Sequence, residues 1–244
     1  NQPQGLIAPA CWSSNQCLLQ FIETAMKALV VGATGETGRR IVQELVKRGI
    51  PTRAMVRDPQ VAATILPPGV EMVQGDVLQP ATLAAALADC TVVLSATGAR
   101  PSFDPTGPYR VDYEGTKNLV DAAQVQGVQH FVMVSSLCVS QFFHPLNLFF
   151  LILLWKQQAE AYLQKSGLTY TIVRPGGLSN QDNDDAVVMA AADTLFEGRI
   201  ARTKVAQTCV ESLFLPASHN KIVEIVARPD APHKNFEQLF TSVA

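Results

Sequence analysis

Charge is scarce in this sequence. Asp, Glu, Lys and Arg make up 16% of the 244 residues, while 48% of the residues are hydrophobic. An ordinary soluble domain has about 25% charged residues. The 19 basic and 21 acidic residues leave a net charge of −2, with no block rich in Lys or Arg. Because nucleic-acid binding depends on such a basic excess, the composition argues against a nucleic-acid partner, and the apolar content argues against disorder.

Metal-binding and disulfide patterns are also lacking. The five cysteines form no CxxC pair, have no histidine at metal-ligand spacing and are odd in number. We therefore expect no metal site and a reducing interior compartment.

The first 25 residues contain no Lys or Arg. This argues against a secretory signal and against an Arg-rich transit peptide. Because Met26 opens the first strand-like run, we interpret residues 1–25 as an extension that is peripheral to function. The alternative is a short amphipathic docking element at Cys17–Ile22. Residues 26–244 are expected to form a single domain.

From Met26 onward, short apolar runs alternate with helical patterns. Strands are expected near 28–31, 52–56, 70–73, 92–95, 128–134, 169–173 and 222–226, and helices near 37–48, 111–126 and 204–215. Nearly continuous apolar strands separated by helices predict a parallel sheet that is covered on both faces. The fold class is therefore α/β, a doubly wound Rossmann fold. Residues 142–155 and 178–244 are expected to cap the substrate side.

A glycine-rich loop directly follows the first expected strand. Glycines there permit a tight turn and bring backbone N–H groups close to a pyrophosphate, which the positive end of the next helix favours. Since the loop lies between a strand and a helix, it predicts a dinucleotide site. The residues expected to bind the cofactor are Gly32, Thr34, Gly35, Glu36, Thr37 and Gly38.

The residue after the second strand indicates which dinucleotide is bound. Arg57 stands where a guanidinium can hold a ribose 2′-phosphate, and Asp58 follows one residue later. We therefore expect NADP(H) to be favoured over NAD(H). Two further strand ends, Asp76-Val77 and Ala96-Thr97-Gly98, are expected to lie along the adenine half.

These motifs resemble the short-chain dehydrogenase/reductase superfamily, specifically its atypical NmrA-like branch, which includes plant and cyanobacterial NAD(P)-binding proteins. The resemblance covers about residues 26–227. It is carried by the glycine loop, Val70–Val77, Val132–Ser136, Trp155–Glu160 and Tyr170–Leu178. It implies NADP(H) along the strand ends, with Asp76 and Val77 near adenine and Lys156 near the nicotinamide ribose. It also implies that Pro175, Gly176 and Gly177 lie near the carboxamide.

One position departs from the family pattern. Catalytic members use a Tyr as proton donor or acceptor, beside a Lys and a carbonyl-orienting Ser. Four residues before Lys156 stands Ile152, which cannot transfer a proton. Tyr113 shows the YxxxK spacing, but in the wrong helix, so we interpret it as a packing residue. Lys156 and Ser135 are the candidate catalytic residues, although Ser135 is also a plausible strand end.

An uncharged stretch of 34 residues separates Asp121 from Lys156. Its second half, 142–155, has eleven large apolar residues in fourteen and reads as a helix from about Leu146. This is shorter than the roughly 20 residues of a transmembrane span, so none is expected. The surface must be covered by the cap, by a partner protein or second copy, or by the interfacial layer of a membrane. We interpret His144 as a loop residue and the acidic loop 182–185 as a solvated connection.

Two functions fit these observations. The first is an NADPH-dependent reductase of a flat conjugated small molecule, such as a flavin, quinone or tetrapyrrole, because such acceptors need little acid–base chemistry. The alternative is a non-catalytic NADP(H)-sensing assembly or regulatory factor that docks on a membrane or protein through 142–155. An ordinary carbonyl reductase or epimerase is disfavoured by Ile152. The expected location is the cytoplasm or plastid stroma, with peripheral membrane contact as a further option.

Overall fold

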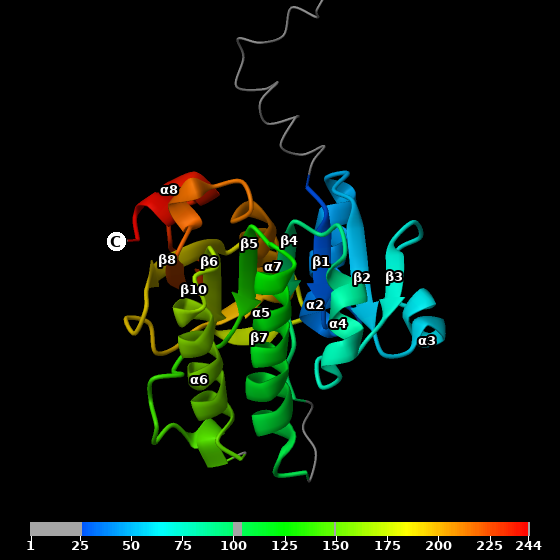
Figure 1. The fold of residues 1–244 in the computed structure, drawn as a ribbon. Helices are drawn as coiled ribbons and strands as arrows, with labels where there is room; N and C mark the ends of the chain where they lie inside the picture. Colours follow the sequence, from blue (N-terminus) through cyan, green and yellow to red (C-terminus); the bar gives the residue numbers. More distant parts are fainter. Residues whose placement is uncertain (1–25, 100–103, 149, 244) are drawn as a thin grey trace, which may run out of the picture.

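The computed structural model describes residues 26–99, 104–148 and 150–243. In these residues, ten strands form one sheet with helices on both faces (Figure 1). The strand order is β3-β2-β1-β4-β5-β6-β10-β9-β7, and β8 pairs with β10 on a separate branch. The strands from β3 to β10 run parallel, whereas β8 and β9 are antiparallel to β10. The order 3-2-1-4-5-6 confirms the doubly wound Rossmann fold.

The elements follow the alternation that the sequence predicts. The Rossmann strands are β1 (Ala28–Val31), β2 (Thr52–Val56), β3 (Glu71–Gln74), β4 (Val92–Ser95), β5 (His130–Val134) and β6 (Tyr170–Pro175). The helices between them are α2 (Glu36–Lys47), α3 (Pro59–Ala63), α4 (Leu83–Leu87), α5 (Gly115–Val125) and α6 (Ile152–Lys165). The last third adds β7 (Gly177–Ser179), β8 (Ala186–Ala191), β9 (Arg199–Ala201), α7 (Arg202–Glu211), β10 (Lys221–Arg228) and α8 (Phe236–Thr241).

The strands are apolar throughout because both faces of the sheet are covered. In β1, Ala28 and Val30 face the core that α2 and α7 complete, whereas Leu29 and Val31 face the core of α4, α5 and α6. All four side chains are buried. The alternation of side chains along a strand therefore serves two cores instead of one core and solvent.

The elements of the C-terminal segment lie at both ends of the parallel strands. Lys221, at the start of β10, donates through Nζ to the carbonyl oxygens of Phe240, at 3.1 Å, and of Val243. This contact places α8 at the amino ends of the parallel strands, at the top of the view in Figure 1. Of the expected cap, β7, β9 and the turn 192–198 therefore lie on the side of the carboxyl ends, and α8 does not.

The prediction of a helix that starts at about Leu146 is wrong for its first residues. Residues Pro145–Leu148 form a 3₁₀ turn, the backbone is left-handed at Phe150 and Leu151 with φ of 56° and 59°, and α6 begins only at Ile152. Asn147 accounts for the break, because its side chain binds backbone groups on both sides. Among the described residues, no helix has the length and apolar character needed to cross a bilayer.

Candidate functional site

A cavity of about 340 Å³ lies at the carboxyl ends of β1, β2, β3 and β4. Its lining brings together nine of the residues expected to bind a dinucleotide, which are Gly32, Thr34, Gly35, Arg57, Asp76, Val77, Ala96, Thr97 and Gly98. Glu36, Thr37 and Gly38 form the first turn of α2, immediately beyond Gly35. We call this the cofactor cavity.

The glycine loop leaves no room for side chains at two positions. Gly32 has a φ of +79°, and a Cβ there would lie 2.6 Å from the Ala96 carbonyl oxygen. A Cβ at Gly38 would lie 2.1 Å from the Gly32 carbonyl oxygen. Gly35, which precedes α2, provides no side-chain acceptor for the N–H groups of its first turn. Those N–H groups fit a pyrophosphate, which supplies the missing acceptors at the positive helix end.

Arg57 and Asp58 have different partners. Asp58 Oδ1 accepts the backbone N–H groups of Gln60 at 2.9 Å and Val61 at 3.2 Å, so this carboxylate already caps α3. The Arg57 side chain is exposed beside the cofactor cavity, and no hydrogen bond or ion pair engages its guanidinium in the part of the chain that the structure describes. The guanidinium is thus free for an anion, whereas the carboxylate is occupied.

Lys156 is held by a buried carboxylate that the sequence analysis missed. Its Nζ lies 2.8 Å from Asp112 Oδ1, and Asp112 Oδ2 accepts the backbone N–H of Ala99 at 3.1 Å. A Cβ on Gly98 would come within 4.0 Å of the Lys156 ammonium. Lys156 therefore lies against the loop after β4, next to the cofactor cavity. Nothing in the sequence marks Asp112 apart from its place one residue before Tyr113.

A second cavity of about 380 Å³ lies beyond the carboxyl ends of β5 and β6, and we call it the acceptor cavity. Its lining joins Ser135 with Pro175, Gly176 and Gly177 but does not include Lys156. Ser135 is 6% exposed, and its Oγ has no hydrogen-bond partner among the described residues. A buried hydroxyl without a partner costs free energy, which a polar ligand atom would recover.

Neither cavity is lined by a tyrosine in the described parts of the chain. The ring of Tyr113 packs with Trp155 instead, with 6.1 Å between the ring centroids. Ile152, at the position of the family's proton donor, packs against a buried cluster around Cys138. His144 does line the acceptor cavity, where its Nδ1 accepts the backbone N–H of Leu146 at 3.2 Å.

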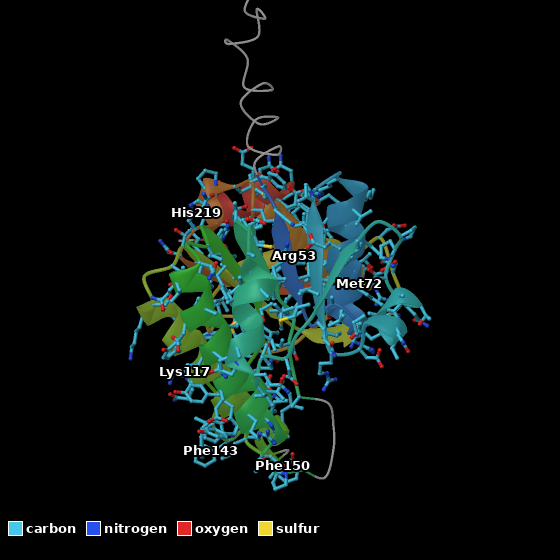
Figure 2. The ribbon with its side chains drawn as sticks, turned by 45° about the vertical axis from the view of Figure 1, so that its right-hand side comes forward. Arg53, Met72, Lys117, Phe143, Phe150 and His219 are labelled. Atoms are coloured by element: carbon cyan, nitrogen blue, oxygen red, sulfur yellow. The ribbon has the colours of Figure 1, made fainter. Side chains whose placement is uncertain are left out.

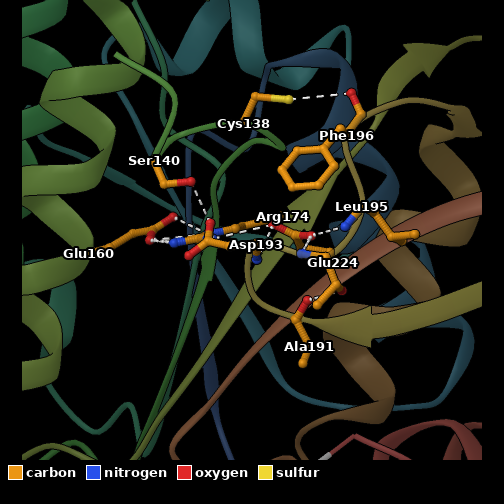
Figure 3. Close-up of polar contacts among 10 residues, drawn as sticks. Cys138, Ser140, Glu160, Arg174, Ala191, Asp193, Leu195, Phe196 and Glu224 are labelled. Atoms are coloured by element: carbon orange, nitrogen blue, oxygen red, sulfur yellow. Dashed lines mark hydrogen bonds and ion pairs between the residues drawn. The ribbon is translucent and has the colours of Figure 1, made fainter.

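An ion network around the buried Arg174 lies next to the acceptor cavity, because Arg174 directly precedes Pro175 and Asp193 belongs to the turn before Phe196 (Figure 3). Arg174 donates to Glu160 Oε2 at 2.7 Å, Asp193 Oδ1 at 2.8 Å and Glu224 Oε1 at 3.3 Å. Ser140 Oγ donates to Asp193 Oδ1 at 2.6 Å. Burial lowers the pKa of Arg174, but hydrogen bonds to Glu160 and its charge outweigh burial, so the net pKa is raised and the guanidinium stays charged.

The network also fixes the turn that contributes Phe196. Glu224 accepts backbone N–H groups from three consecutive residues, Asp193, Thr194 and Leu195, at 2.9, 3.1 and 2.7 Å. Figure 3 shows how these contacts draw the turn toward Arg174. The sequence analysis did not find this network, because its charged members are spread over the 65 positions from Glu160 to Glu224.

Five large apolar side chains are exposed around the 3₁₀ turn before α6, and we call them the apolar tip. Phe143 is 96% exposed and Leu148 is 86% exposed. Figure 2 shows Phe143 and Phe150 at the end of the molecule farthest from His219. The apolar tip consists of Phe142, Phe143, Leu146, Leu148 and Phe150. The described parts of the cap leave these side chains uncovered.

The parallel sheet, the glycine loop before α2 and the cavity at the carboxyl ends define a dinucleotide-binding Rossmann protein. The sequence profile of a family described as NAD(P)H-binding matches residues 32–216. The chain therefore belongs to this NAD(P)H-binding family of atypical short-chain dehydrogenases/reductases, as the resemblance implied.

Known proteins agree with this assignment. An uncharacterized chloroplastic protein of Arabidopsis thaliana is 48% identical over 89% of this chain and 82% of its own length. The chloroplastic protein TIC 62 of Pisum sativum is 38% identical over 88% of this chain, which spans only 45% of that relative. Sanguinarine reductase of Eschscholzia californica is 30% identical over 89% of this chain and 96% of its own length.

A solved structure supports the fold. A putative NAD-dependent epimerase/dehydratase of Bacillus halodurans superposes with a TM-score of 0.77 at 26% identity, over 88% of this chain and 99% of that one.

Proposed function

We propose that this chain is an NADPH-dependent reductase of a flat conjugated acceptor, such as a flavin, quinone or tetrapyrrole. The observation that carries the proposal is the acceptor cavity. Its described lining includes the apolar side chains of Leu137, Leu178 and Phe196, one buried unpartnered hydroxyl on Ser135 and no tyrosine. A relative named as a reductase, sanguinarine reductase, supports the same class of reaction.

The residues at the site would bind and orient rather than transfer a proton. A bound nicotinamide supplies the hydride, so the protein need only position the two partners and exclude water. Ser135 Oγ would donate a hydrogen bond to an acceptor oxygen or nitrogen. Lys156, fixed by Asp112 at 2.8 Å, would hold the nicotinamide ribose, and Pro175, Gly176 and Gly177 would present backbone groups to the carboxamide.

NADP(H) is the cofactor that we propose over NAD(H). Arg57 is exposed beside the cofactor cavity and is free to hold a 2′-phosphate, whereas the Asp58 carboxylate is occupied as the cap of α3. Asp76 and Val77 would contact adenine, and Ala96, Thr97 and Gly98 would lie along the same half of the cofactor.

The reductase proposal is tested by NADPH oxidation against a panel of flavins, quinones and tetrapyrroles. We expect turnover with one class and a loss of about tenfold or more in kcat for Ser135→Ala, since one buried hydrogen bond to the acceptor is removed. Ser242→Ala, at an exposed serine that lines neither cavity, is the control. Turnover no faster than that of the free cofactor with every acceptor would exclude the proposal.

A second candidate function rests on the apolar tip. Contiguous exposed apolar surface marks an interaction site, and five uncharged large side chains gather here. In this candidate function, the protein is located in the plastid stroma. NADP(H) binding changes how its apolar tip docks on a partner protein or on the interfacial layer of a membrane. The chloroplastic names of two relatives support that location.

Cosedimentation with vesicles and pull-down from stromal extract, each with NADP⁺, NADPH or neither, separates this candidate from the first. A cofactor-dependent difference that disappears in Phe143→Ser/Leu148→Ser supports docking, and Val125→Ser is the control at an exposed apolar position elsewhere. Equal binding under all three conditions means that no differential affinity exists and the sensing role is excluded.

A further inference from the structure

One cation at the acceptor cavity has no carboxylate partner. Arg202, the first residue of α7, lines this cavity and is partly exposed. Its Nη1 donates to the neutral side-chain oxygen of Asn180 at 2.8 Å. No ion pair involves Arg202 in residues 26–99, 104–148 and 150–243. A guanidinium that is held in place without a counter-charge suits an incoming anion.

Charged groups of both signs surround Arg202. Arg39, Arg40 and Glu36 act on it from α2, and Asp182 accepts a hydrogen bond from the adjacent Thr203. Helices α2 and α7 pack together, and the ion pair between Arg48 and Glu211, at 2.8 Å, joins their last turns. Their first turns are therefore neighbours as well. Arg39 and Arg40 lie in the first turns of α2 and share one carboxylate, Glu36 Oε2, at 2.7 and 3.0 Å.

The pKa of Arg202 is lowered from its ordinary value, with burial as the largest cause. The charge of Glu36 raises this pKa, and the charges of Arg40 and Arg39 lower it. A bound anion would stabilise the charged form of the guanidinium. The carboxylate in the cavity lining, Glu197, is exposed and forms no ion pair with Arg202 among the described residues.

A second observation points to a ligand in the same cavity. Ser135 also lines this cavity and is 6% exposed, and its Oγ has no partner in the described residues. The lining also includes the apolar side chains of Leu137, Leu178 and Phe196. The cavity therefore combines a buried hydroxyl, apolar side chains and a partly exposed cation.

We propose that Arg202 binds a carboxylate or phosphate group of the acceptor, so that the preferred acceptors are flat conjugated molecules with an acidic side arm. This inference rests on the proposed function and names its substrate class. The cofactor pyrophosphate is the other source of an anion near this helix end. Arg202 does not line the cofactor cavity, where the glycine loop would hold the pyrophosphate. It lines the acceptor cavity, where only the nicotinamide end of the cofactor is expected, and this favours the acceptor as the source of the anion.

The test compares ligands that differ only in the acidic group. Equilibrium binding is measured at saturating NADP⁺ for flavin mononucleotide against riboflavin, and for a bilin dicarboxylic acid against its dimethyl ester. The protein should bind the acidic member of at least one pair about tenfold or more tightly, as a charge-assisted pair requires. Arg202→Gln should remove this preference and leave both the neutral member and NADP⁺ unaffected.

Two further variants sharpen the result. Arg202→Lys keeps the charge but loses the planar fork, so it should retain part of the preference. Arg228→Gln, at an exposed arginine at the end of β10, should retain all of it. If Arg202→Gln weakens NADP⁺ binding and leaves the preference intact, the guanidinium serves the pyrophosphate and the inference is overturned. An equal affinity of the wild-type protein for both members of each pair overturns it too.

These measurements distinguish failure of the anion site from failure of the reductase function. An Arg202-dependent preference for acidic ligands without NADPH oxidation supports the anion site and contradicts the reductase function. Turnover of neutral and acidic acceptors that bind with equal affinity supports the reductase function and contradicts the anion site.

Discussion

Asn147 Oδ1 accepts the backbone N–H of Leu153 at 3.0 Å, across the left-handed break that precedes α6. The same oxygen accepts the Leu154 N–H at 3.3 Å, and Nδ2 donates to the carbonyl oxygen of Phe142 at 2.8 Å. One side chain thus caps α6 and holds the loop that carries the apolar tip.

Removing this side chain should loosen the loop before it unfolds the domain. Asn147→Ala removes a helix cap and leaves buried backbone groups unpaired, so we expect a loss of about 2 kcal/mol in unfolding free energy. Limited proteolysis should cut within residues 141–151 first. Asn183→Ala, in an exposed loop, is the control. A proteolysis pattern identical to that of the wild type contradicts the assigned role.

Gly35→Asp should separate stability from cofactor binding. Gly35 is the N-cap of α2 in an extended conformation, and a Cβ there would lie 3.1 Å from the Gly32 carbonyl oxygen. An Asp side chain can accept the free N–H groups, but its gain over glycine at an N-cap is only about a few tenths of a kcal/mol. The same carboxylate would occupy and repel the pyrophosphate position. We expect thermal stability close to that of the wild type together with loss of NADP⁺ binding. Gly35→Asn, which lacks the charge, should lose less affinity, and equal losses would rule out charge repulsion as the cause.

Arg57→Ala should weaken NADP(H) binding and spare NAD(H). Loss of a guanidinium–phosphate contact costs about 2 kcal/mol, or roughly 30-fold in Kd. Titration calorimetry with NADP⁺ and NAD⁺ measures both constants. Lys47→Ala removes an exposed cation at the far end of α2 and should change neither. Equal weakening of both dinucleotides would refute the assignment of the 2′-phosphate to Arg57.

His130 should make the domain less stable in mild acid. Burial lowers its pKa to about 4, with the charge of His219 as a smaller cause. The unfolded chain, with an ordinary pKa of 6.5, therefore binds more protons between these values, so stability is highest above pH 6.5 and falls toward pH 4. The loss should be on the order of 3 kcal/mol.

Denaturant unfolding of His130→Gln across the same pH range measures this effect. The variant should show a shallower fall toward acid than the wild type, whereas His233→Gln, at an exposed histidine, should follow the wild-type slope. Parallel slopes for all three proteins would assign the acid sensitivity to other groups.

Arg174→Met should be among the most destabilising single changes. It leaves Glu160 and Glu224, each with a side chain 1% exposed, buried without a counter-charge. Breaking one side of a buried pair costs about 3–5 kcal/mol. Chemical denaturation measures the loss, and Arg228→Met at an exposed arginine should cost less than about 0.5 kcal/mol. A small loss for Arg174→Met would mean that water reaches these carboxylates.

Much of the cofactor cavity could be predicted from the sequence because its residues depend on local features. Gly32 must adopt a positive φ, and Gly38 must let the helix approach the loop, so both positions demand glycine whatever surrounds them. The apolar strands likewise follow from burial on both faces. These residues encode their roles within a few positions of one another.

Less of the acceptor cavity and its surroundings could be predicted, because their organisation depends on contacts between residues that are far apart in the sequence. Periodicity predicted a helix from Leu146, but the Asn147 side chain competes for the backbone and delays α6 to Ile152. Lys156 was identified by its motif, yet its buried partner Asp112 lies 44 positions earlier. Such pairs have no local pattern.

The sequence by itself determined the sheet, the glycine loop and the low charge of residues 122–155, since strand burial, turn geometry and composition are local properties. Only the tertiary structure decided that Arg174 collects Glu160, Asp193 and Glu224, that Asp58 is occupied while Arg57 is free, and that the apolar tip stays uncovered. The physical reason is that desolvation and charge pairing act between side chains that folding brings together, whatever their separation along the chain.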